Sequence, residues 1–322
     1  MSAASGTRAI IAALGANLGI AATKFLAFAL TGSSSMLAES IHSVADSGNQ
    51  ALLLLGGKRA RREATPEHPF GFGRERYVYA FIVSIVLFTV GGLFALYEGY
   101  HKLIDPHPID AWQWVPIVVL VIAIGLEAFS FRTAIQESNK LRARSTWVQF
   151  IRRSRVPELP VVLLEDFAAL IGLAFALFGV SLTLATGNGT WDGIGTVLIG
   201  LLLVSVAVIL AIETKSLLIG ESATRENVSQ IEKAIVDGHE IERIIHMKTM
   251  HLGPEELLVA AKVGVPRAAT AADVADAIDA AERRIRASVP IARVIYIEPD
   301  IYKDTRTRDA GQDSAAKDSA AT

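Results

Sequence analysis

The chain has 322 residues, 51% of them hydrophobic, and a mean hydropathy of +0.39. This composition excludes an ordinary soluble protein of this size, and the net charge of −2 gives no reason to expect a nucleic-acid partner. The absence of cysteine excludes disulfides, iron–sulfur centres and thiolate metal sites. Any metal ion must therefore be bound by nitrogen and oxygen ligands.

Long apolar runs in the first two thirds of the chain predict six membrane segments, because crossing a bilayer takes roughly 20 residues. Their approximate ranges are residues 9–30, 33–56, 77–100, 112–134, 159–185 and 193–212. Trp112, Trp114 and Trp191 fall at segment ends, where interfacial aromatic residues are typical. We therefore expect an all-α six-helix transmembrane bundle over residues 1–213.

The loops between these segments differ strongly in charge. Lysine and arginine are concentrated after the second and fourth segments, whereas Lys102 is the only basic residue (Lys or Arg) in the loops on the opposite side. By the positive-inside rule, both basic loops and both termini should be cytoplasmic.

After residue 213 the sequence pattern is that of a small α+β domain. Thr224 could cap one helix, and Thr270 with Asp273 resembles a capping box that opens another. The expected elements are helices at residues 224–236 and 270–287 and strands at residues 241–252, 256–265 and 294–297. This αββαβ order suits a ferredoxin-like cytoplasmic domain over residues 214–303. Residues 304–322 lack apolar content, so a disordered tail is expected.

The second segment carries ionisable side chains at a depth where they are energetically expensive. His42 and Asp46 are four residues apart and lie on one face of a helix, and Glu39 and Asn49 extend the same stripe. Such groups by default mark an ion pathway or a binding site. An imidazole and a carboxylate one turn apart also form part of a ligand set for a divalent transition metal. The alternative is that they only hydrogen-bond neighbouring helices.

The fifth segment supplies a second pair of acids. Glu165 and Asp166 are adjacent and therefore about 100° apart around a helix axis. Only one of them can easily face the same partner as Asp46. Asp166 reaches the depth of Asp46 if the segment begins early, for instance with Pro157 in its first turn.

Further polar residues within the predicted segments need partners. Asn17 and Lys24 interrupt the first segment, and Glu127 lies inside the fourth. Glu127 could pair with Lys24, line the cytoplasmic approach, or make a hydrogen bond that packs two helices.

Three features of the sequence together resemble one family. They are the run SMLAESIHSVADSGNQ, the loop HPFGFGRERY at residues 68–77, and six segments followed by a small C-terminal domain. All three are similar to the cation diffusion facilitators, which are divalent-metal/proton antiporters, over about residues 8 to 300. The run LLEDFAAL at residues 163–170 and the HSVAD sequence are most similar to the zinc transporter 9-like branch.

The resemblance implies the partners of the chain. They are a transported divalent cation (zinc first, with manganese, iron or cobalt as alternatives), protons, the lipid bilayer and a second copy in a homodimer. It implies no cofactor, and no catalytic arrangement of an enzyme is visible. We expect an integral protein of a bacterial inner membrane.

In this family the transport site consists of a His/Asp-x-x-x-Asp pair on segment two and a similar pair on segment five. His42 and Asp46 match the first pair, and Asp166 matches the last member of the second. Val162 stands at the remaining position and cannot coordinate a metal, so the chain departs from the four-ligand pattern.

Another donor must fill the gap that Val162 leaves. The candidates are Glu165, Glu39, Asn49 and water, of which we favour Glu165. An oxygen-rich site would relax the preference for zinc toward manganese, iron or cobalt.

The accessory metal sites of the family match this sequence only in part, and a regulatory metal site in the C-terminal domain stays an alternative. In the loop after segment two, His68 matches one ligand, but Thr65 and Phe72 occupy other ligand positions. In the C-terminal domain, His239 and Glu298 fall at ligand positions, but Lys262 and Tyr296 replace their partners. His246 and His251 lie on opposite faces of a strand because their spacing is odd, and we expect both at the surface.

Two functional classes follow. In the first, a secondary antiporter moves a divalent cation out of the cytoplasm, and His42 couples it to protons because an imidazole with its ordinary pKa of about 6.5 binds either proton or metal near neutral pH. In the second, the chain is a membrane-anchored metal sensor or scaffold without transport. A proton-coupled carrier of a non-metal substrate is a third possibility.

Overall fold

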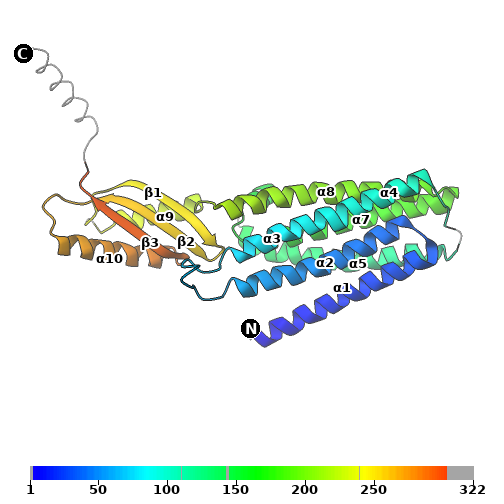
Figure 1. The fold of residues 1–322 in the computed structure, drawn as a ribbon, viewed down its shortest axis with the longest axis horizontal. Coiled ribbons are helices and arrows are strands. Elements are labelled where there is room, and N and C mark those ends of the chain that lie inside the picture. The colour runs from blue at the N-terminus through cyan, green and yellow to red at the C-terminus, as the bar shows by residue number, and fades with distance from the viewer. Residues whose placement is uncertain (1–2, 110, 143–144, 239, 303–322) are drawn as a thin grey trace, which may run out of the picture. The chain divides into compact units, whose positions relative to one another are not determined.

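The computed structural model describes residues 3–109, 111–142, 145–238 and 240–302. They form two compact units that divide between Ile219 and Gly220, and each is described by itself. Helices make up the first unit, and the second combines helices with a three-stranded sheet (Figure 1). The predicted tail, residues 304–322, and His239 lie outside the described residues.

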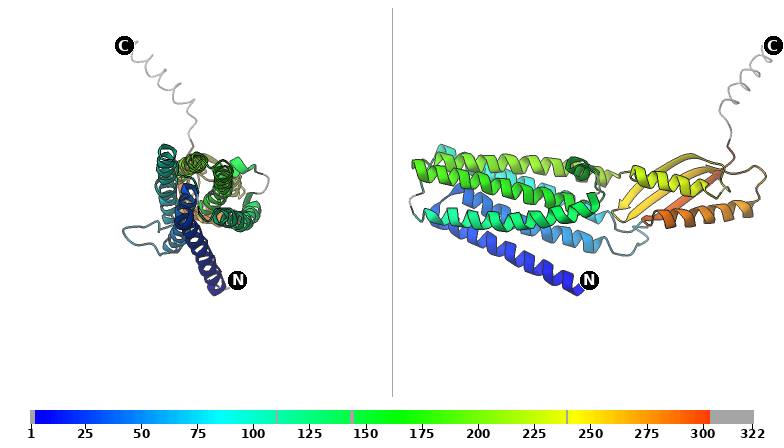
Figure 2. Two further views of the ribbon diagram at one scale, coloured as in Figure 1. Left: turned by 90° about the vertical axis from the view of Figure 1, so that its right-hand side faces the viewer. Right: turned by 180° about the vertical axis from the view of Figure 1, so that it is seen from behind.

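Long helices run side by side in the first unit (Figures 1 and 2). The elements are α1 (Ala3–Thr31), α2 (Ser34–Arg59), α3 (Glu75–Val86), the π-helix η1 (Leu87–Leu93), α4 (Phe94–Ile104), α5 (Trp114–Arg142), α6 (Trp147–Arg153), α7 (Glu158–Thr186) and α8 (Thr190–Ile219).

Within the described part of the chain, four helical stretches are long and apolar enough to cross a membrane. They are Glu75–Ile104, Trp114–Asn139, Glu158–Thr186 and Thr190–Ile219. The described apolar part of α1, Asn17–Thr31, is shorter. Helix α2 is long enough, with 26 residues, but its acidic, histidine, asparagine and serine side chains lower its hydropathy. The polar residues that make α2 a candidate site are thus the reason why it does not stand out as a membrane segment.

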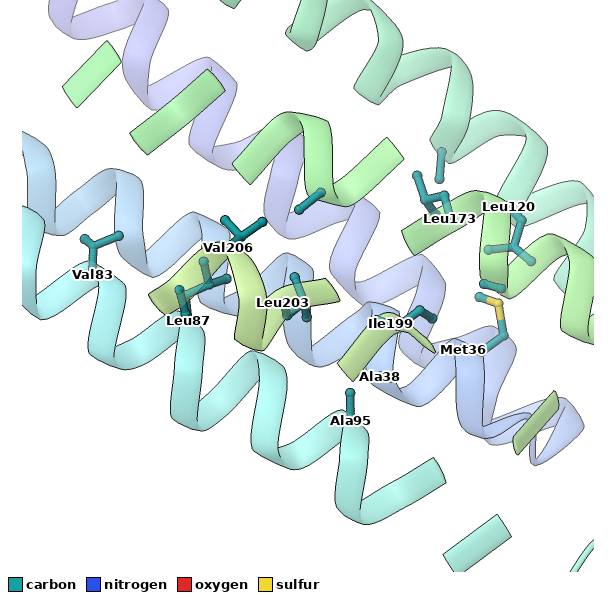
Figure 3. Packing of buried hydrophobic residues seen from close by; sticks show 14 of the residues in the cluster. Met36, Ala38, Val83, Leu87, Ala95, Leu120, Leu173, Ile199, Leu203 and Val206 are labelled. Carbon is teal, nitrogen blue, oxygen red and sulfur yellow. The ribbon is translucent and has the colours of Figure 1, made fainter. Parts of the chain in front are cut away.

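The third predicted segment, residues 77–100, is a continuous helical stretch with a π-helical turn in its middle. Glycines let this turn approach α8 closely: a Cβ atom on Gly92 would lie 2.7 Å from Val204 Cγ2, and one on Gly91 3.3 Å from Leu203 Cδ1. Figure 3 shows Leu87 of η1 packed with Leu203 and Val206 of α8 in the buried core of the bundle.

The second unit contains α9 (Arg225–Val236), β1 (Arg243–Gly253), β2 (Glu256–Gly264), α10 (Ala271–Ser288) and β3 (Ala292–Asp300). The sheet order is β1-β2-β3, with β1 antiparallel and β3 parallel to β2. Alternate residues of β2, from Leu257 to Val263, are buried in the same apolar core as α9 and α10. The predicted αββαβ order is present, and β3 is longer than the expected 294–297.

Both predicted helix caps of this unit are present. Thr224 accepts a hydrogen bond from the backbone N–H of Asn227, and Thr270 forms a capping box with Asp273. The prediction that His251 lies at the surface is wrong: its side chain is buried, whereas His246 is exposed. The chain before α9 covers His251, whose backbone N–H donates to the carbonyl of Glu221 (2.9 Å).

Candidate functional site

One face of α2 carries a buried polar stripe. Glu39, His42 and Asn49 are at most 1% exposed, and the side chain of Asp46 is 17% exposed. The Nδ1 atom of His42 lies 3.4 Å from Oδ1 of Asp46 one turn further along. Among the described residues, neither imidazole nitrogen of His42 has a hydrogen-bond partner, and neither does Oδ1 of Asp46. Buried polar atoms normally have hydrogen-bond partners, so these atoms without a partner indicate a binding site.

The two acids of α7 have different partners, as their adjacent positions predict. Oε1 of Glu165 accepts a hydrogen bond from Nδ2 of Asn49 (2.7 Å), whereas Oδ2 of Asp166 accepts one from the hydroxyl of Ser130 on α5 (2.9 Å). Helix α7 begins at Glu158, directly after Pro157, so Asp166 lies two turns inside it.

Asp46 and Asp166 face one small cavity. Its volume of about 20 Å³ is enough for one water molecule. Side chains of α1, α2, α5 and α7 line it: Asn17, Ile20, Ser43, Asp46, Gln50, Glu127, Ser130 and Asp166. The structure therefore brings together the two carboxylates that the sequence analysis assigned to one site, although they come from different helices.

Lys24 is paired with a residue other than Glu127. Its Nζ atom donates to Oε2 of Glu39 (3.0 Å) and to the hydroxyl of Ser43 (2.8 Å). Of the three possibilities for Glu127, the ion pair with Lys24 is therefore not formed, because Lys24 binds the carboxylate one turn before His42. Glu127 lines the cavity together with Asp46 and Asp166.

The structure does not test which donor takes the position of Val162. Val162 is partly buried and packs against the apolar core, and the favoured substitute, Glu165, is held by Asn49. No three histidine, aspartate or glutamate side chains in the described ranges are close enough to form a metal cage. The arrangement can accept a cation at His42 and Asp46, and a further carboxylate must approach to complete its ligand set.

Two polar residues of the site were missed by the sequence analysis. Gln50 lies four residues after Asp46 and accepts a hydrogen bond from Asn17 (3.2 Å), and Ser130 lies three residues after Glu127. Helical spacing from an acid already singled out is the signal that could have identified both.

The imidazole of His42 faces the π-helical turn. A Cβ atom on Gly91 would lie 4.0 Å from its Nδ1 atom. Single π-helical turns are rare and are frequently found at functional sites. Here the turn places a residue without a side chain beside the histidine.

The proposed accessory ligands have structural roles. In the loop after α2, the ring of His68 packs against Phe72 (centroids 4.7 Å apart), and Arg62 lies over the same ring (4.3 Å). In the second unit, Lys262 forms ion pairs with Glu298 (2.9 Å) and Asp300 (3.1 Å). Hydrogen bonds to these carboxylates raise the pKa of Lys262, so Glu298 is occupied by an ammonium group.

Residues 10–219 match the family described as the cation efflux transmembrane domain. The chain belongs to this family. The resemblance to the cation diffusion facilitators is thereby confirmed, and the zinc antiporters described next confirm the similarity to the zinc transporter 9-like branch.

Several named cation efflux proteins are similar to the chain. It is 34% identical over 242 residues to "Proton-coupled zinc antiporter SLC30A9, mitochondrial" of Xenopus laevis, covering 74% of this chain and 43% of the relative. The Homo sapiens protein of the same name is 33% identical over 232 residues (71% and 41%). "Metal tolerance protein C4" of Arabidopsis thaliana is 31% identical over 249 residues (77% and 54%). The chain thus spans less than half the length of these two zinc antiporters.

These cation efflux relatives contradict the prediction of a bacterial inner membrane with cytoplasmic termini. The relatives from Xenopus laevis and Homo sapiens are named as mitochondrial, and the metal tolerance protein comes from a plant. The physical reason for the error is that apolar length and the positive-inside rule describe insertion into a bilayer, not which membrane receives the protein. The part of that prediction that the relatives support is that the chain is an integral membrane protein.

Proposed function

We propose that this chain is a secondary transporter that exchanges a divalent transition-metal cation, zinc first, for protons. The observation that carries the proposal is that Asp46 of α2 and Asp166 of α7 face one cavity, with His42 next to Asp46. Membership of the cation efflux family and the names of its zinc antiporters support the same reading.

The proposed architecture has six membrane segments, because α1 and α2 join the four apolar stretches. Their polar residues face neighbouring helices, as the contact between Lys24 and Glu39 illustrates. Residues 1–213 form the transport domain, and residues 214–303 form a ferredoxin-like module through which two copies associate. The αββαβ order supports this fold. Dimerisation is inferred from the family.

In the proposed site, the cation is bound by His42, Asp46 and Asp166. Glu165 becomes the fourth ligand when it exchanges its hydrogen bond with Asn49 for the metal, and otherwise water completes the set. Three oxygen donors beside one nitrogen make the site less selective for zinc than a nitrogen-rich one, so manganese, iron and cobalt are secondary substrates.

Protons and metal compete for the same ligand atoms, which is how the two fluxes are coupled. An imidazole binds a metal only through an unprotonated nitrogen, and a carboxylate likewise loses its proton on coordination. Rocking of helices around a fixed site then exposes it to one side of the membrane at a time. No enzymatic step is part of this cycle.

The test is zinc-driven proton flux in liposomes that contain the purified protein and an internal pH-sensitive dye. In the wild type, zinc that enters the liposomes should make the lumen more alkaline, and zinc that leaves should make it more acidic. Asp46→Ala and Asp166→Ala should abolish this proton flux. Asp105→Ala, which removes a carboxylate whose side chain is 76% exposed, is the matched control. Undiminished flux in Asp46→Ala would refute the proposed site, and a wild type that binds zinc without transport would be a sensor or scaffold.

A further inference from the structure

The bundle contains a buried ion pair that the transport site does not require. Lys24 of α1 is 1% exposed and Glu39 of α2 is 0% exposed, and 3.0 Å separates Nζ from Oε2. Removing two charges from water is costly, and a pair offsets this cost only with good geometry and further hydrogen bonds. The structure supplies one such bond, from Lys24 to Ser43.

This pair is directly connected to the cavity. Ser43, which accepts the hydrogen bond from Lys24 (2.8 Å), is also one of the residues that line the cavity between Asp46 and Asp166. Glu39 lies three residues before His42 and therefore on the same stripe of α2. The ammonium group of Lys24 thus lies at the border of the proposed cation site.

Glu39 has one occupied and one open oxygen. Oε2 binds Lys24, whereas Oε1 is buried and has no hydrogen-bond partner among the described residues. A Cβ atom added to Gly172 of α7 would lie 2.9 Å from Oε1. The carboxylate therefore reaches from the lysine of α1 to the helix that carries Asp166, and one of its oxygens is available to a ligand.

The polar stripe continues beyond Glu39 to the beginning of α2. There the hydroxyl groups of Ser34 and Ser35 both lie 3.0 Å from the hydroxyl of Thr196 on α8. Between the cavity and this end of α2, Glu39 is the only acidic residue among the described residues of the helix, and it is paired with Lys24. A cation that leaves His42 in this direction meets Glu39 next.

We propose that Lys24 is a tethered cation that competes with the transported cation for Glu39. This inference rests on the proposed function and names the residue that regulates release from its site. When the divalent cation moves from His42 and Asp46 to Glu39, the ammonium group is displaced, and it returns when the cation leaves. Lys24 thereby prevents Glu39 from retaining the divalent cation, because the flexible, singly charged ammonium group takes its place on the carboxylate. Lys24 is a positioning residue and does not bind the cargo.

The experiment measures zinc-driven proton flux in liposomes as a function of zinc concentration. Lys24→Met keeps the length and packing of the side chain but removes its charge, so Glu39 should retain zinc. We expect the half-saturating zinc concentration to fall about tenfold, as loss of a nearby like charge favours the dication, and the maximal rate to fall as well. Lys24→Arg should recover most of both values. The matched control is Lys102→Met, which removes a second buried lysine, whose ammonium group donates to the carbonyl of Gly32 (3.2 Å).

A second pair of variants keeps the inference falsifiable if Lys24→Met does not fold. Glu39→Gln leaves the ammonium uncompensated beside the site and should raise the half-saturating concentration. The double variant Lys24→Met/Glu39→Gln removes both charges and should return it toward the wild-type value. A role in packing alone would lower the maximal rate without lowering the half-saturating concentration.

The inference is overturned if Lys24→Met has a half-saturating concentration equal to or above that of Lys102→Met while the wild type transports zinc. It is also overturned if Glu39→Gln shifts that concentration downward. A wild type without any zinc-driven flux would instead refute the proposed function, so the two failures are distinguishable.

Discussion

The beginning and the middle of α2 are both buried and polar, but only the beginning is saturated with hydrogen bonds. At the beginning, the carboxylate of Asp192 on α8 accepts from the hydroxyl of Ser33 (2.9 Å), from the backbone N–H of Ser34 (2.8 Å) and of Ser35 (3.3 Å), and from the hydroxyl of Ser34 (3.2 Å). A carboxylate at a helix N-terminus also interacts favourably with the helix dipole.

In the middle of the same helix, the polar atoms are incompletely paired. Both ring nitrogens of His42, Oδ1 of Asp46 and Oδ1 of Asn49 lack a hydrogen-bond partner among the residues that the structure describes. Burial of polar groups therefore does not by itself identify a site. A saturated cluster such as Asp192 with its serines anchors a helix, whereas an unsaturated one is poised to bind.

The largest expected effect on activity is at the unsaturated cluster. His42→Ala should eliminate nearly all zinc-driven proton flux, because it removes the one nitrogen ligand of the proposed site. Its thermal unfolding midpoint in detergent should fall less than that of Asp192→Ala, since truncating the buried ring leaves a cavity but breaks no hydrogen bond. Flux and unfolding are measured on the same preparation. Retained flux would show that the ring nitrogens of His42, although they lack hydrogen-bond partners, do not mark the site.

Asp192→Ala tests the saturated cluster and should have the largest effect on stability. Removing the carboxylate leaves buried donors of Ser33, Ser34 and Ser35 unpaired, which should cost about 3 kcal/mol. Thermal unfolding in detergent measures the loss, and Asp192→Asn, which keeps one acceptor oxygen, should lose less. Equal unfolding midpoints for Asp192→Ala and the wild type would remove the distinction between the two clusters.

Ser130→Ala should have an intermediate effect, on affinity rather than stability. The hydroxyl of Ser130 orients Asp166 (2.9 Å), and loss of such a supporting hydrogen bond typically weakens metal binding about tenfold or more. Zinc titration of the purified protein measures this. Ser205→Ala, which removes an exposed serine of α8, is the control, and an affinity of Ser130→Ala equal to that of the control would contradict the role.

The smallest effect is expected at the capping box of the second unit, which is saturated but exposed. Thr270→Ala should destabilise α10 by about 1 kcal/mol and leave zinc flux unchanged. Hydrogen bonds from Thr270 lower the pKa of Asp273, so the contribution of this carboxylate is present above its ordinary pKa of 3.8. It is lost as the pH falls through the lower folded-state pKa. The difference in unfolding midpoint between variant and wild type should narrow as the pH falls below 3.8 but not vanish, because the backbone N–H of Asp273 still donates to Thr270 (3.2 Å).

Local patterns in the sequence predicted much of this protein. Periodicity located the long helices, the caps at Thr224 and Thr270 are formed, and the four-residue spacing of His42 and Asp46 placed them together. These features depend on residues within a few positions of each other, so sequence alone determines them.

Contacts between distant segments were not predictable in the same way. The partner of Ser34 is 158 residues away on α8, and nothing in the sequence around Asp192 indicates a helix cap. The partner of Lys24 was left open between alternatives, because sequence gives depth in the membrane but not which helices are neighbours. The π-helical turn was missed because its residues, LFTVGGL, are as apolar as those of an ordinary membrane helix.

That π-helical turn determines which face of the helical stretch its later residues occupy. Leu87, Gly91, Ala95 and Gly99 are all buried, although residues four apart drift by about 40° per step in a regular α-helix, or about 120° over the three steps. A π-helical turn takes up roughly one additional residue, worth about 100° of rotation, and this cancels most of the drift. Deleting one residue between Leu87 and Leu93 would therefore swing Gly99 away from Val197, against which it now packs too closely for any side chain.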